Sequence, residues 1–541
     1  MNRTTLNMIA LGVMLLPSAL VSQQRLPTKM APKPTTGAVT PADLMSRVYV
    51  FADDSMMGRE TGTVYHNRGT DYIARELTRL GLKPAGENGT YFQSLPFMSR
   101  MLASDASVTV DGKTYQPWTD FLPRDNAGAV EPIRNATAVY GGVFGDTTKM
   151  VSAADAAGKV VVFSVPRGYQ ANRPALLQRY QASAAIVVAT LDSVPKPLIT
   201  ELQVPMVLPA GTPQQLPPVA FFYSTRAMAD AMFGAPVTSL RAGTTGKVVN
   251  GSMRFAETPA PGVRNVIAIL PGSDPVLRNQ YVAIGSHSDH IGFRFPIDHD
   301  SLLAFYHIVR PGGADDNDKQ PAATDWPKIR AFLDSVRKIR PPRQDSISNG
   351  ADDDASGSMG MLEVAEAFAT ASQKPKRSIL FVWHVGEEQG LFGSKFFTDN
   401  PTVPRDSIVA QINIDMIGRG GAADTPGGGP GYLQLIGSRR LSTELGDIVE
   451  AEGKKFNPPF RFDYTYDANG HPGQYYCRSD HYEYAKYGIP VVFMSTGGHP
   501  EYHQITDEPQ YLDYEQLTRV TQLVLNVATR VANLDRRVLV D

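Results

Sequence analysis

Cysteine is nearly absent from this sequence: among its 541 residues, Cys477 is the single one. One thiol cannot form an intramolecular disulfide, and it cannot build a cysteine-based zinc cluster. We assign Cys477 no role. Support for the fold must therefore come from core burial, together with any metal held by other ligand types.

An excess of charge of either sign is also missing. The chain has 52 Lys and Arg residues against 54 Asp and Glu residues, a net charge of -2. A nucleic-acid footprint or an electrostatic hold on anionic membranes requires a basic excess, so we expect neither partner. The 42% hydrophobic and 20% charged content is typical of a soluble globular protein. The length predicts two or three domains.

The chain starts with an apolar run that is too short to cross a membrane comfortably. The run from Met8 to Val21 follows Arg3, and a membrane-spanning helix needs roughly 20 apolar residues. A basic start, a short apolar region and a small residue at Ser22 predict a signal peptide over residues 1–22, although Leu20 fits the cleavage site poorly. We expect a secreted or periplasmic protein without stable membrane insertion. A disordered or lightly anchored tail is the alternative.

The motifs of several common enzyme classes are not present. There is no His-Glu-x-x-His helix, no Gly-x-Ser-x-Gly turn and no complete P-loop. We find no internal repeat. These absences disfavour the corresponding metalloprotease, serine hydrolase and nucleotidase chemistries.

From Val263 onward, strand-like and helix-like segments alternate, which predicts an α/β layer fold. The expected strands are 265–270, 281–285, 379–383, 408–413, 432–436 and 491–494. The expected helices are 42–51, 69–80, 359–371 and 514–534. Between about 136 and 250, short β-rich runs separated by glycine and proline predict a small inserted module. The chain would then comprise 23–135 as the start of the catalytic domain, 136–250 as the insert and 251–541 as the catalytic domain.

Glu387 and Glu388 lie side by side after the apolar run 378–384, between Gly386 and Gly390. Burying an ionised carboxylate costs several kcal/mol or more without a partner. A metal ion could neutralise one acid while the other acts as a general base for a metal-bound water. An ordinary solvated turn is the alternative for the pair taken alone.

Other candidate ligands follow other predicted strands. His287 follows 281–285, Asp415 follows 408–413 and His503 lies past 491–494, while an acidic run around Asp353 precedes a helix. Ligands of α/β sheets bind beyond the carboxyl ends of the strands, so we expect these groups to converge. Imidazole and carboxylate suit zinc, and five such ligands without cysteine favour a bridged two-metal site.

These motifs resemble the co-catalytic zinc exopeptidases, a family that includes aminopeptidase Y, bacterial leucyl aminopeptidases and glutamate carboxypeptidases. The resemblance covers roughly Val263 to the C-terminus. It is carried by the strings SHSDHIG, GADDDASG, VGEEQGLFGS, NIDMIG and SDH, followed by YHQITDEP. It implies a mixed, mostly parallel sheet sandwiched by helices. The 136–250 segment resembles a protease-associated domain, and the leader VFADDSMMGRETGT resembles the N-terminal segment of secreted members.

The resemblance also implies two Zn²⁺ ions and a role for each ligand. His287 and Asp415 would complete one zinc site, Glu388 and His503 the other, and Asp353 would bridge them. Glu387 would be the general base and acid, and Asp289 would orient His287. Tyr476 would help to polarise the scissile carbonyl, with an ordinary core aromatic as the alternative.

The function implied is that of a secreted aminopeptidase acting on peptide substrates. A carboxypeptidase or a glutaminyl-cyclase-like enzyme of the same family is the first alternative, and an inactive receptor-like binding protein is the second. The sequence makes no prediction of oligomeric state.

Two features depart from the family pattern. The interval between His287 and Asp353 is long and contains a second acidic run, 313–318. We prefer Asp353 because Ser356-Gly357 and a helix follow it. The insertion at about 294–349 is interpreted as a lid or a specificity loop.

The remaining histidines are given structural or surface roles. We expect His290 and His481 to support the site and His384 to pack beneath it. Surface or loop positions are expected for the others, namely His66, His299, His307, His471 and His499.

Overall fold

The computed structural model describes residues 26–123, 132–144, 149–165, 173–194, 205–211, 219–260 and 262–541, with the single residues 196, 199 and 203. The predicted signal peptide, 1–22, lies outside them. The chain divides into two compact units, which are described separately. One comprises Met1–Leu95 with Pro261–Asp541, and the other is Pro96–Ala260. In the described part of the chain, no helix is long and apolar enough to span a membrane.

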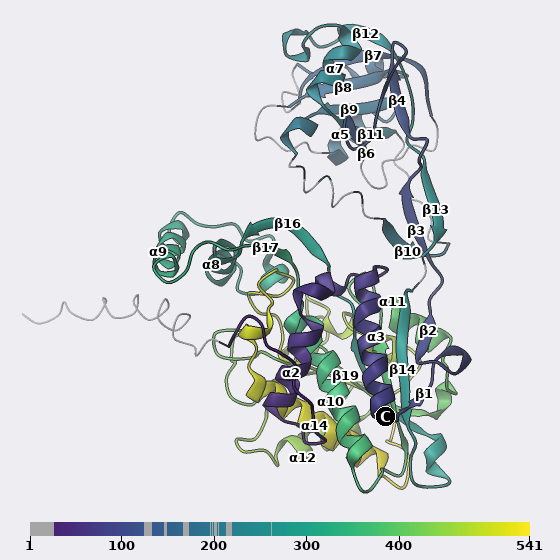
Figure 1. Cartoon of the computed structure of the whole chain (residues 1–541), viewed down its shortest axis with the longest axis vertical. Coiled ribbons are helices and arrows are strands. Elements are labelled where there is room, and N and C mark those ends of the chain that lie inside the picture. The colour runs from purple at the N-terminus through teal and green to yellow at the C-terminus, as the bar shows by residue number, and fades with distance from the viewer. Residues whose placement is uncertain are drawn as a thin grey trace, which may run out of the picture. The chain divides into compact units, whose positions relative to one another are not determined.

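A nine-stranded sheet organises the first unit (Figure 1). Its order in the described residues is β1-β14-β18-β15-β19-β22-β20-β21, with β2 also paired to β14. The strands are β1 (Lys83–Pro84), β2 (Phe92–Ser94), β14 (Arg264–Leu270), β15 (Tyr281–His287), β18 (Ser378–His384), β19 (Ile408–Ile414), β20 (Tyr432–Ile436), β21 (Arg461–Asp463) and β22 (Val491–Ser495). All six predicted strands are present.

The centre of this sheet is parallel and its flanks are mixed. β15 pairs in parallel with β18 and β19, and β19 pairs in parallel with β22. β14 and β20 run antiparallel to their neighbours β18 and β22. The α/β class with a mixed sheet is therefore confirmed. Because the four central strands point the same way, their carboxyl ends lie along one edge.

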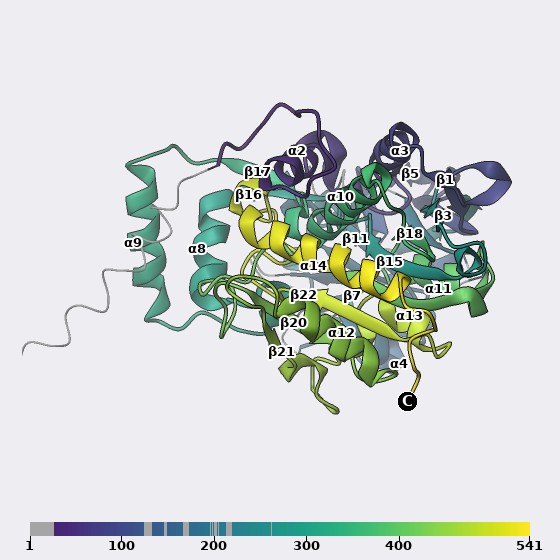
Figure 2. The same ribbon diagram turned by 90° about the horizontal axis from the view of Figure 1, so that it is seen from below.

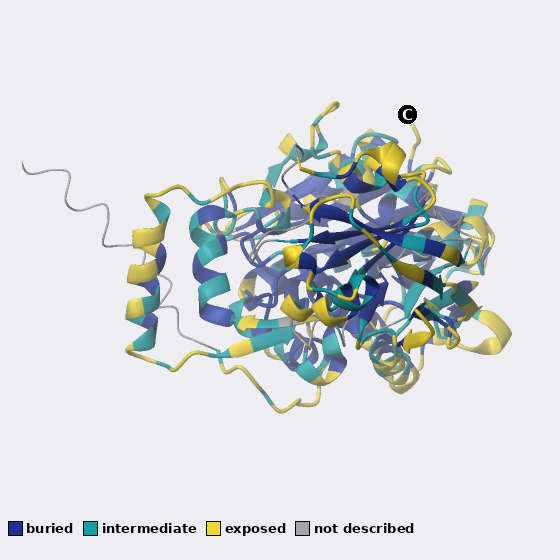
Figure 3. Cartoon of the chain, turned by 90° about the horizontal axis from the view of Figure 1, so that it is seen from above, coloured by how far each residue is buried: buried dark blue, intermediate teal, exposed yellow. Residues whose placement is uncertain are grey.

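Both faces of the sheet are covered, which explains why its strands are nearly continuous apolar runs. In β14, Val266 and Ala268 join one core cluster, whereas Ile267 and Ile269 join another. This alternation follows the two-residue period of a strand. Figure 2 shows α10 and α14 crossing one face, and Figure 3 shows the strands as buried.

The helices on that first face are α2 (Pro41–Phe51), α3 (Val64–Arg79), α10 (Gly357–Thr370), α12 (Thr443–Gly453) and α14 (Tyr514–Ala532). On the other face lie α11 (Phe392–Asp399) and α13 (His481–Ala485), which contribute Phe397 and Tyr484 to the second cluster. The four predicted helices are present. α3 begins before the predicted residue 69 because Thr63 caps it, accepting a hydrogen bond from the His66 N–H at 3.2 Å.

The second unit is a β-rich body with its own core. Its eight-stranded sheet has the order β5-β4-β12-β7-β8-β9-β11-β6, and a three-stranded sheet has the order β10-β3-β13. These strands are β3 (Phe97–Leu102), β4 (Ser107–Val110), β5 (Lys113–Tyr115), β6 (Phe121–Pro123), β7 (Ile133–Val143), β8 (Val160–Ser164), β9 (Ala185–Ala189), β10 (Met206–Pro209), β11 (Ala220–Ser224), β12 (Thr245–Ser252) and β13 (Phe255–Pro259).

The unit is wider than the predicted insert, 136–250. It starts at Pro96, because β3 pairs with β13 from the far end of the segment, with Phe255 opposite Leu102. Boundary prediction relied on composition, which does not reveal this pairing.

The insertion between β15 and α10 forms a substructure of the first unit. β16 (Phe293–Asp298) and β17 (Gln344–Ile347) pair as its antiparallel base. Between them lie α8 (His299–Val309), the short turn η6 (Gly313–Asp316) and α9 (Asp325–Arg337). α8 and α9 lie side by side (Figures 1 and 2) and share a small apolar core that includes Leu303, Phe332 and Val336.

Candidate metal centre

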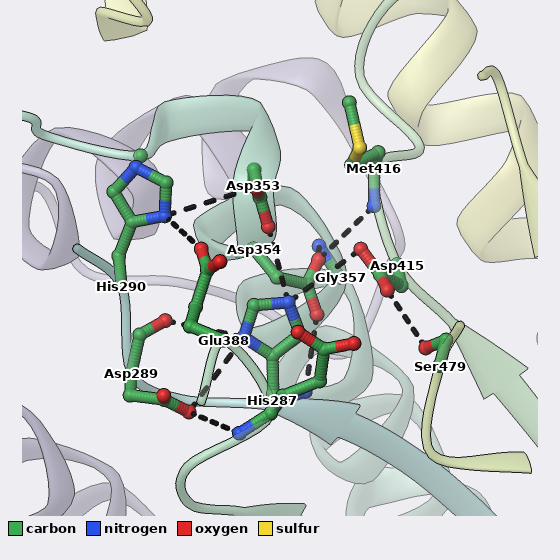
Figure 4. Close-up of polar contacts among 12 residues, drawn as sticks. His287, Asp289, His290, Asp353, Asp354, Gly357, Glu388, Asp415, Met416 and Ser479 are labelled. Carbon is green, nitrogen blue, oxygen red and sulfur yellow. Dashed lines mark hydrogen bonds and ion pairs between the residues drawn. The ribbon is translucent and has the colours of Figure 1, made fainter. Parts of the chain in front are cut away.

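The predicted ligands meet at the carboxyl edge of the sheet, and Figure 4 shows four of them, His287, Asp353, Glu388 and Asp415. His287 is the last residue of β15, and Asp415 directly follows β19. Glu388 lies in the turn after β18, and His503 lies in the loop after β22. Asp353 belongs to η7 (Ala351–Ser356), which leads into α10. The topology thus brings together side chains that are far apart in the sequence.

Asp353 lies between two sets of ligands. Its Oδ1 is 3.1 Å from Nε2 of His287, and that same Nε2 is 3.6 Å from Oδ1 of Asp415. Its Oδ2 is 3.0 Å from Nε2 of His503, which is 2.8 Å from Oε2 of Glu388. Each carboxylate oxygen of Asp353 therefore faces a different set.

Two groups of residues have potential ligand atoms that all lie within 4.8 Å of one another. They are His287–Asp353–Asp415 and His290–Asp353–Glu388. The donors are imidazole nitrogens and carboxylate oxygens, which is the ligand chemistry of zinc in proteins. His290 enters the second group because its Nδ1 is 2.6 Å from Oε1 of Glu388. His290 therefore touches the site, as expected.

The orientation of His287 is fixed by its other ring nitrogen. Nδ1 lies 3.1 Å from the carbonyl oxygen of Asp289 and 3.7 Å from that residue's carboxylate. A hydrogen bond from Nδ1–H to this carbonyl leaves Nε2 directed at the carboxylates. Asp289 therefore lies beside His287. The group nearest to the ring is its backbone carbonyl, whereas the prediction was that its side chain orients the ring. Its carboxylate accepts a hydrogen bond from the Thr61 hydroxyl at 2.9 Å.

The loop that presents Asp353 is held by a residue that the sequence analysis did not single out. The Asp507 carboxylate accepts hydrogen bonds from the backbone N–H of Asp352 at 3.0 Å and of Asp353 at 3.1 Å. On the other side, the Asp354 carboxylate accepts from the N–H of Gly357 at 2.8 Å and of His287 at 3.2 Å. Asp507 lies within the string YHQITDEP, but only the fold shows what it binds.

The two adjacent glutamates are in different electrostatic states. Burial raises the pKa of Glu387 well above its usual value, and the nearby Asp415 and Glu388 carboxylates add to the effect. Burial also favours the neutral form of Glu388, but the neighbouring His503 and His290 outweigh it and lower the pKa of this acid. Glu388 is therefore ionised beside the histidines, and Glu387 can hold a proton. Such a separation of two carboxyl groups is typical of acid–base sites.

A cleft opens beside these groups. Its lining includes Asp353, Glu387, Asp415 and His503 on the ligand side. The remaining lining residues are Asp315, Met416, Gln434, Ile436, Tyr475, Arg478, Ser479, Phe493, Ser495, Gly497, Gly498 and Tyr502. Of the two acidic runs, the one at Asp353 enters the ligand cluster, and the other places Asp315 on the cleft wall.

Tyr476 is not among the cleft-lining residues. The Arg440 guanidinium lies over its ring, 4.0 Å from the centroid, and the ring packs edge-on against Tyr482. The tyrosines that line the cleft are Tyr475 and Tyr502. Tyr502 directly precedes His503, with ring centroids 4.1 Å apart, and its hydroxyl accepts a hydrogen bond from Arg478 at 3.2 Å.

The expectation of surface or loop positions is wrong for His66 and His299, which are completely buried on α3 and α8, whereas His499 lies in a loop but is also completely buried. Nε2 of His299 bonds to Glu508 at 2.8 Å, and Nε2 of His499 is 3.2 Å from Asp352. Charged partners that are distant in the sequence compensate for burial, and single-sequence patterns do not reveal them.

His384, which was expected to pack beneath the site, and His481, which was expected to support it, are both completely buried. Nδ1 of His384 is 3.2 Å from Asp480, and its Nε2 bonds to the Tyr484 hydroxyl at 3.0 Å. The ring of His481 stacks on Phe493, which lines the cleft.

Comparison with known proteins gives a family and several relatives. Residues 327–528 match Peptidase family M28. Over 156 residues the chain is 30% identical to leupeptin-inactivating enzyme 1 of Streptomyces exfoliatus, covering 28% of this chain and 31% of that protein. Over 229 residues it is 28% identical to a probable leucine aminopeptidase of Arthroderma benhamiae, covering 38% and 59%. The alignments therefore span less than two thirds of either relative.

Among solved structures, the chain is similar to BSAP, a zinc aminopeptidase from Bacillus subtilis. The identity is 15%, the TM-score is 0.46, and the alignment covers 91% of this chain and 95% of that one. The family match confirms the predicted resemblance over residues 327–528, which contain every string that carries it except SHSDHIG.

Proposed function

We propose that this chain, whose residues 327–528 match peptidase family M28, is a zinc-dependent exopeptidase that removes residues from the amino end of peptides. The observation that carries the proposal is that each carboxylate oxygen of Asp353 faces a different set of ligand atoms, and that Asp353, Glu387, Asp415 and His503 line one cleft. A structural metal site needs no such cleft and no acid with a raised pKa.

The ligand roles follow from which side chains face each oxygen of Asp353. His287 and Asp415 would hold one zinc ion, Glu388 and His503 the other, and Asp353 would bridge them. Bound zinc would supply a Lewis acid and lower the pKa of water. His290 would hold Glu388 in place through its hydrogen bond to Oε1.

Glu387 and Tyr502 are the proposed proton-handling groups. Glu387 lines the cleft and would accept a proton from the attacking water and deliver it to the leaving amine. Burial raises the pKa of Tyr502 well above its usual value, so its hydroxyl keeps its proton. That hydroxyl would donate to the developing oxyanion, the role expected from sequence for Tyr476.

The charges of the cleft favour a substrate with a free amine. Arg478 is the one Lys or Arg side chain among the residues that line the cleft, and it is already paired with Asp315 at 2.9 Å. A carboxypeptidase needs a free cation for the terminal carboxylate of its substrate. By contrast, Asp353, Glu387 and Asp415 present carboxylates that attract an ammonium group.

Export remains part of the proposal. The basic start and apolar run of residues 1–22 support a signal peptide and a secreted or periplasmic location. The β-rich unit Pro96–Ala260, which interrupts the first unit, supports a protease-associated domain. Finding residue 1 intact in the exported protein would contradict cleavage.

The test compares Glu387→Gln with the wild type on aminoacyl anilides carrying a free or an acetylated α-amine. We expect cleavage of the free-amine substrate only, and a loss of about 10²- to 10⁴-fold in kcat for the variant. Metal analysis should give two zinc ions per chain for both. Glu515→Gln, an exposed position on α14, is the matched control.

Several outcomes would point elsewhere. Unchanged anilide cleavage by Glu387→Gln would refute the assigned base. Cleavage of N-blocked dipeptides in place of anilides would indicate a carboxypeptidase. No bound zinc, with stability unaffected by a chelator, would support the receptor-like alternative.

A further inference from the structure

An ion pair contributed by the insertion forms part of the cleft wall. Nη2 of Arg478 is 2.9 Å from Oδ1 of Asp315, and Nη1 is 3.2 Å from Oδ2. The Tyr475 hydroxyl also donates to Oδ2 at 3.0 Å. The side chains of Asp315 and Arg478 are 31% and 35% exposed, so both remain accessible from the cleft that they line.

The backbone around Asp315 is fixed against the loop that carries His503. The N–H of Ala314 donates to the carbonyl oxygen of Tyr502 at 3.2 Å. Gly313 has a φ of +62°, and a Cβ there would lie 2.6 Å from the carbonyl oxygen of His499. Such close approach requires glycine. Asp315 is therefore held at the cleft wall both by the backbone contacts of residues 313–314 and by its ion pair with Arg478.

The part of the cleft wall outside the proposed ligands and Glu387 carries no net charge, because the charges of Asp315 and Arg478 offset each other. Apart from the proposed ligands and Glu387, the charged side chains among the lining residues are Asp315 and Arg478. Their neighbours are apolar, small or neutral: Met416, Gln434, Ile436, Ser495, Phe493 and the glycines 497 and 498.

We propose that the Asp315–Arg478 pair sets the charge selectivity of the cleft for the terminal residue of the substrate. This inference rests on the proposed function, because the cleft must receive the end of a peptide. The two charges neutralise each other, so the wall favours an uncharged side chain. An acidic side chain would compete with Asp315 for Arg478, and a basic one would compete with Arg478 for Asp315.

Neutralising one member of the pair leaves the charge of the other without its partner. The remaining charge is positive when Asp315 is replaced and negative when Arg478 is replaced. Asp315→Asn leaves the Arg478 cation without a carboxylate, which favours acidic terminal residues. Arg478→Met leaves the Asp315 carboxylate, which favours basic ones. Combining the two variants removes both charges and returns the preference to neutral residues.

The experiment measures kcat/KM for the anilides of leucine, glutamate and lysine. We expect the Glu/Leu ratio to rise about tenfold in Asp315→Asn and the Lys/Leu ratio to rise about tenfold in Arg478→Met. The double variant should lie within about threefold of the wild-type ratios. Ratios are used because Arg478 also touches Tyr502, whose disturbance alters the rate for every substrate. Asp325→Asn, which removes an acid paired with Lys328 on α9, is the control.

Calorimetric binding of free leucine, glutamate and lysine to the zinc-loaded protein gives the same comparison without turnover. Opposite shifts of the Kd ratios in the two variants would support the inference. If the same protein cleaved no anilide, the proposed reaction would be refuted while the inference stood. Ratios that stay unchanged, or that move in the same direction in both single variants, would overturn the inference.

Discussion

The guanidinium of Arg59 donates a hydrogen bond to the carbonyl oxygen of Asn349 at 2.7 Å. It also donates to the carbonyl oxygens of Gly350 at 3.0 Å and Ser288 at 3.3 Å. Arg59 therefore joins the chain segments on which His287 and Asp353 lie. The side chain is completely buried, and its hydrogen-bond acceptors in the described structure are backbone carbonyls.

The positive charge of Arg59 also stabilises the acidic residues around the candidate metal centre. Burial lowers the pKa of Arg59 to about 10, against the opposing attraction of nearby acids that include Asp353, Asp507 and Asp289. It therefore remains a cation at neutral pH. A buried cation among these acids reduces their mutual repulsion before any metal binds.

Arg59→Met is expected to destabilise the protein by roughly 3–5 kcal/mol, because it leaves carbonyls and acids buried without their partner. It should also weaken zinc binding by about 10- to 100-fold, as the loss of groups that orient metal ligands does. Arg59→Lys keeps the charge but not the planar set of donors, so its zinc affinity should be intermediate. Urea unfolding and chelator competition measure the two effects, with the exposed Arg75→Met as control. Equal zinc affinity in Arg59→Met and wild type would refute the positioning role.

The two histidines near Glu388 should differ in metal content. If His503 is a ligand, His503→Ala should retain about one tightly bound zinc per chain, because only one of the two sites stays complete. If His290 only holds Glu388, His290→Ala should retain two, with the affinity of the second reduced about 10- to 100-fold. Metal analysis after dialysis distinguishes these results. The reverse pattern would exchange the roles of the two residues.

Sequence alone predicts the site residues that lie at the ends of strands. His287, Glu388 and Asp415 follow apolar runs that are recognisable as strands, and a parallel sheet places such ends along one edge. Local periodicity is enough to place them, and the family match at residues 327–528 covers the motifs of Glu388 and Asp415.

The residues that sequence analysis missed act through contacts between distant segments. Arg59 reaches Asn349, Asp507 reaches Asp352, and Asp315 reaches Arg478. None of these pairs is marked by local spacing or composition. Tyr502 was passed over for Tyr476 because both lie near recognised motifs and only the fold shows which tyrosine lines the cleft.

Arg47 joins three helices in the core of the first unit. From α2, Nε lies 2.8 Å from Glu363 on α10, and Nη1 lies 3.0 Å from Glu76 on α3. It also pairs with Glu366, and its own side chain is 1% exposed. Removing one member of a buried ion network leaves the others uncompensated, so Arg47→Met should cost roughly 3–5 kcal/mol in urea unfolding.

The pH dependence of this cost is a second, independent readout. Burial outweighs the Arg47 charge and raises the pKa of Glu363 to about 7. A folded-state acid with a raised pKa binds its proton more readily than the unfolded chain, so stability falls as pH rises from about 4.5 through 7. Without Arg47 the penalty should be larger at pH 8 than at pH 6. Arg79→Met, at a side chain that is 45% exposed, should cost no more than about 1 kcal/mol. An equal loss in the free energy of unfolding for Arg47→Met and Arg79→Met would contradict the expectation that the buried arginine contributes more to stability.

His481 predicts a loss of stability in mild acid. It is completely buried, and its ring stacks on Phe493 with centroids 4.8 Å apart. Burial disfavours the imidazolium and lowers the pKa of His481 from 6.5 to about 3. Between these values the unfolded chain binds a proton that the folded chain does not bind. This contribution to stability is therefore complete above about pH 6.5 and is lost progressively as the pH falls toward 3.

His481→Phe retains a stacked ring and removes the titration. Between pH 6.5 and pH 5 the wild type should lose about 1.6 kcal/mol more stability than the variant, because proton uptake by the unfolded chain rises from half a proton to nearly one across this window and a full proton is worth about 1.4 kcal/mol per pH unit. Urea unfolding of both proteins at the two pH values gives the difference, in which metal release and other acid effects cancel. His471→Phe, at a partly exposed position, is the control and should follow the wild type. Parallel pH profiles for His481→Phe and the wild type would show that His481 is not held neutral in the folded protein.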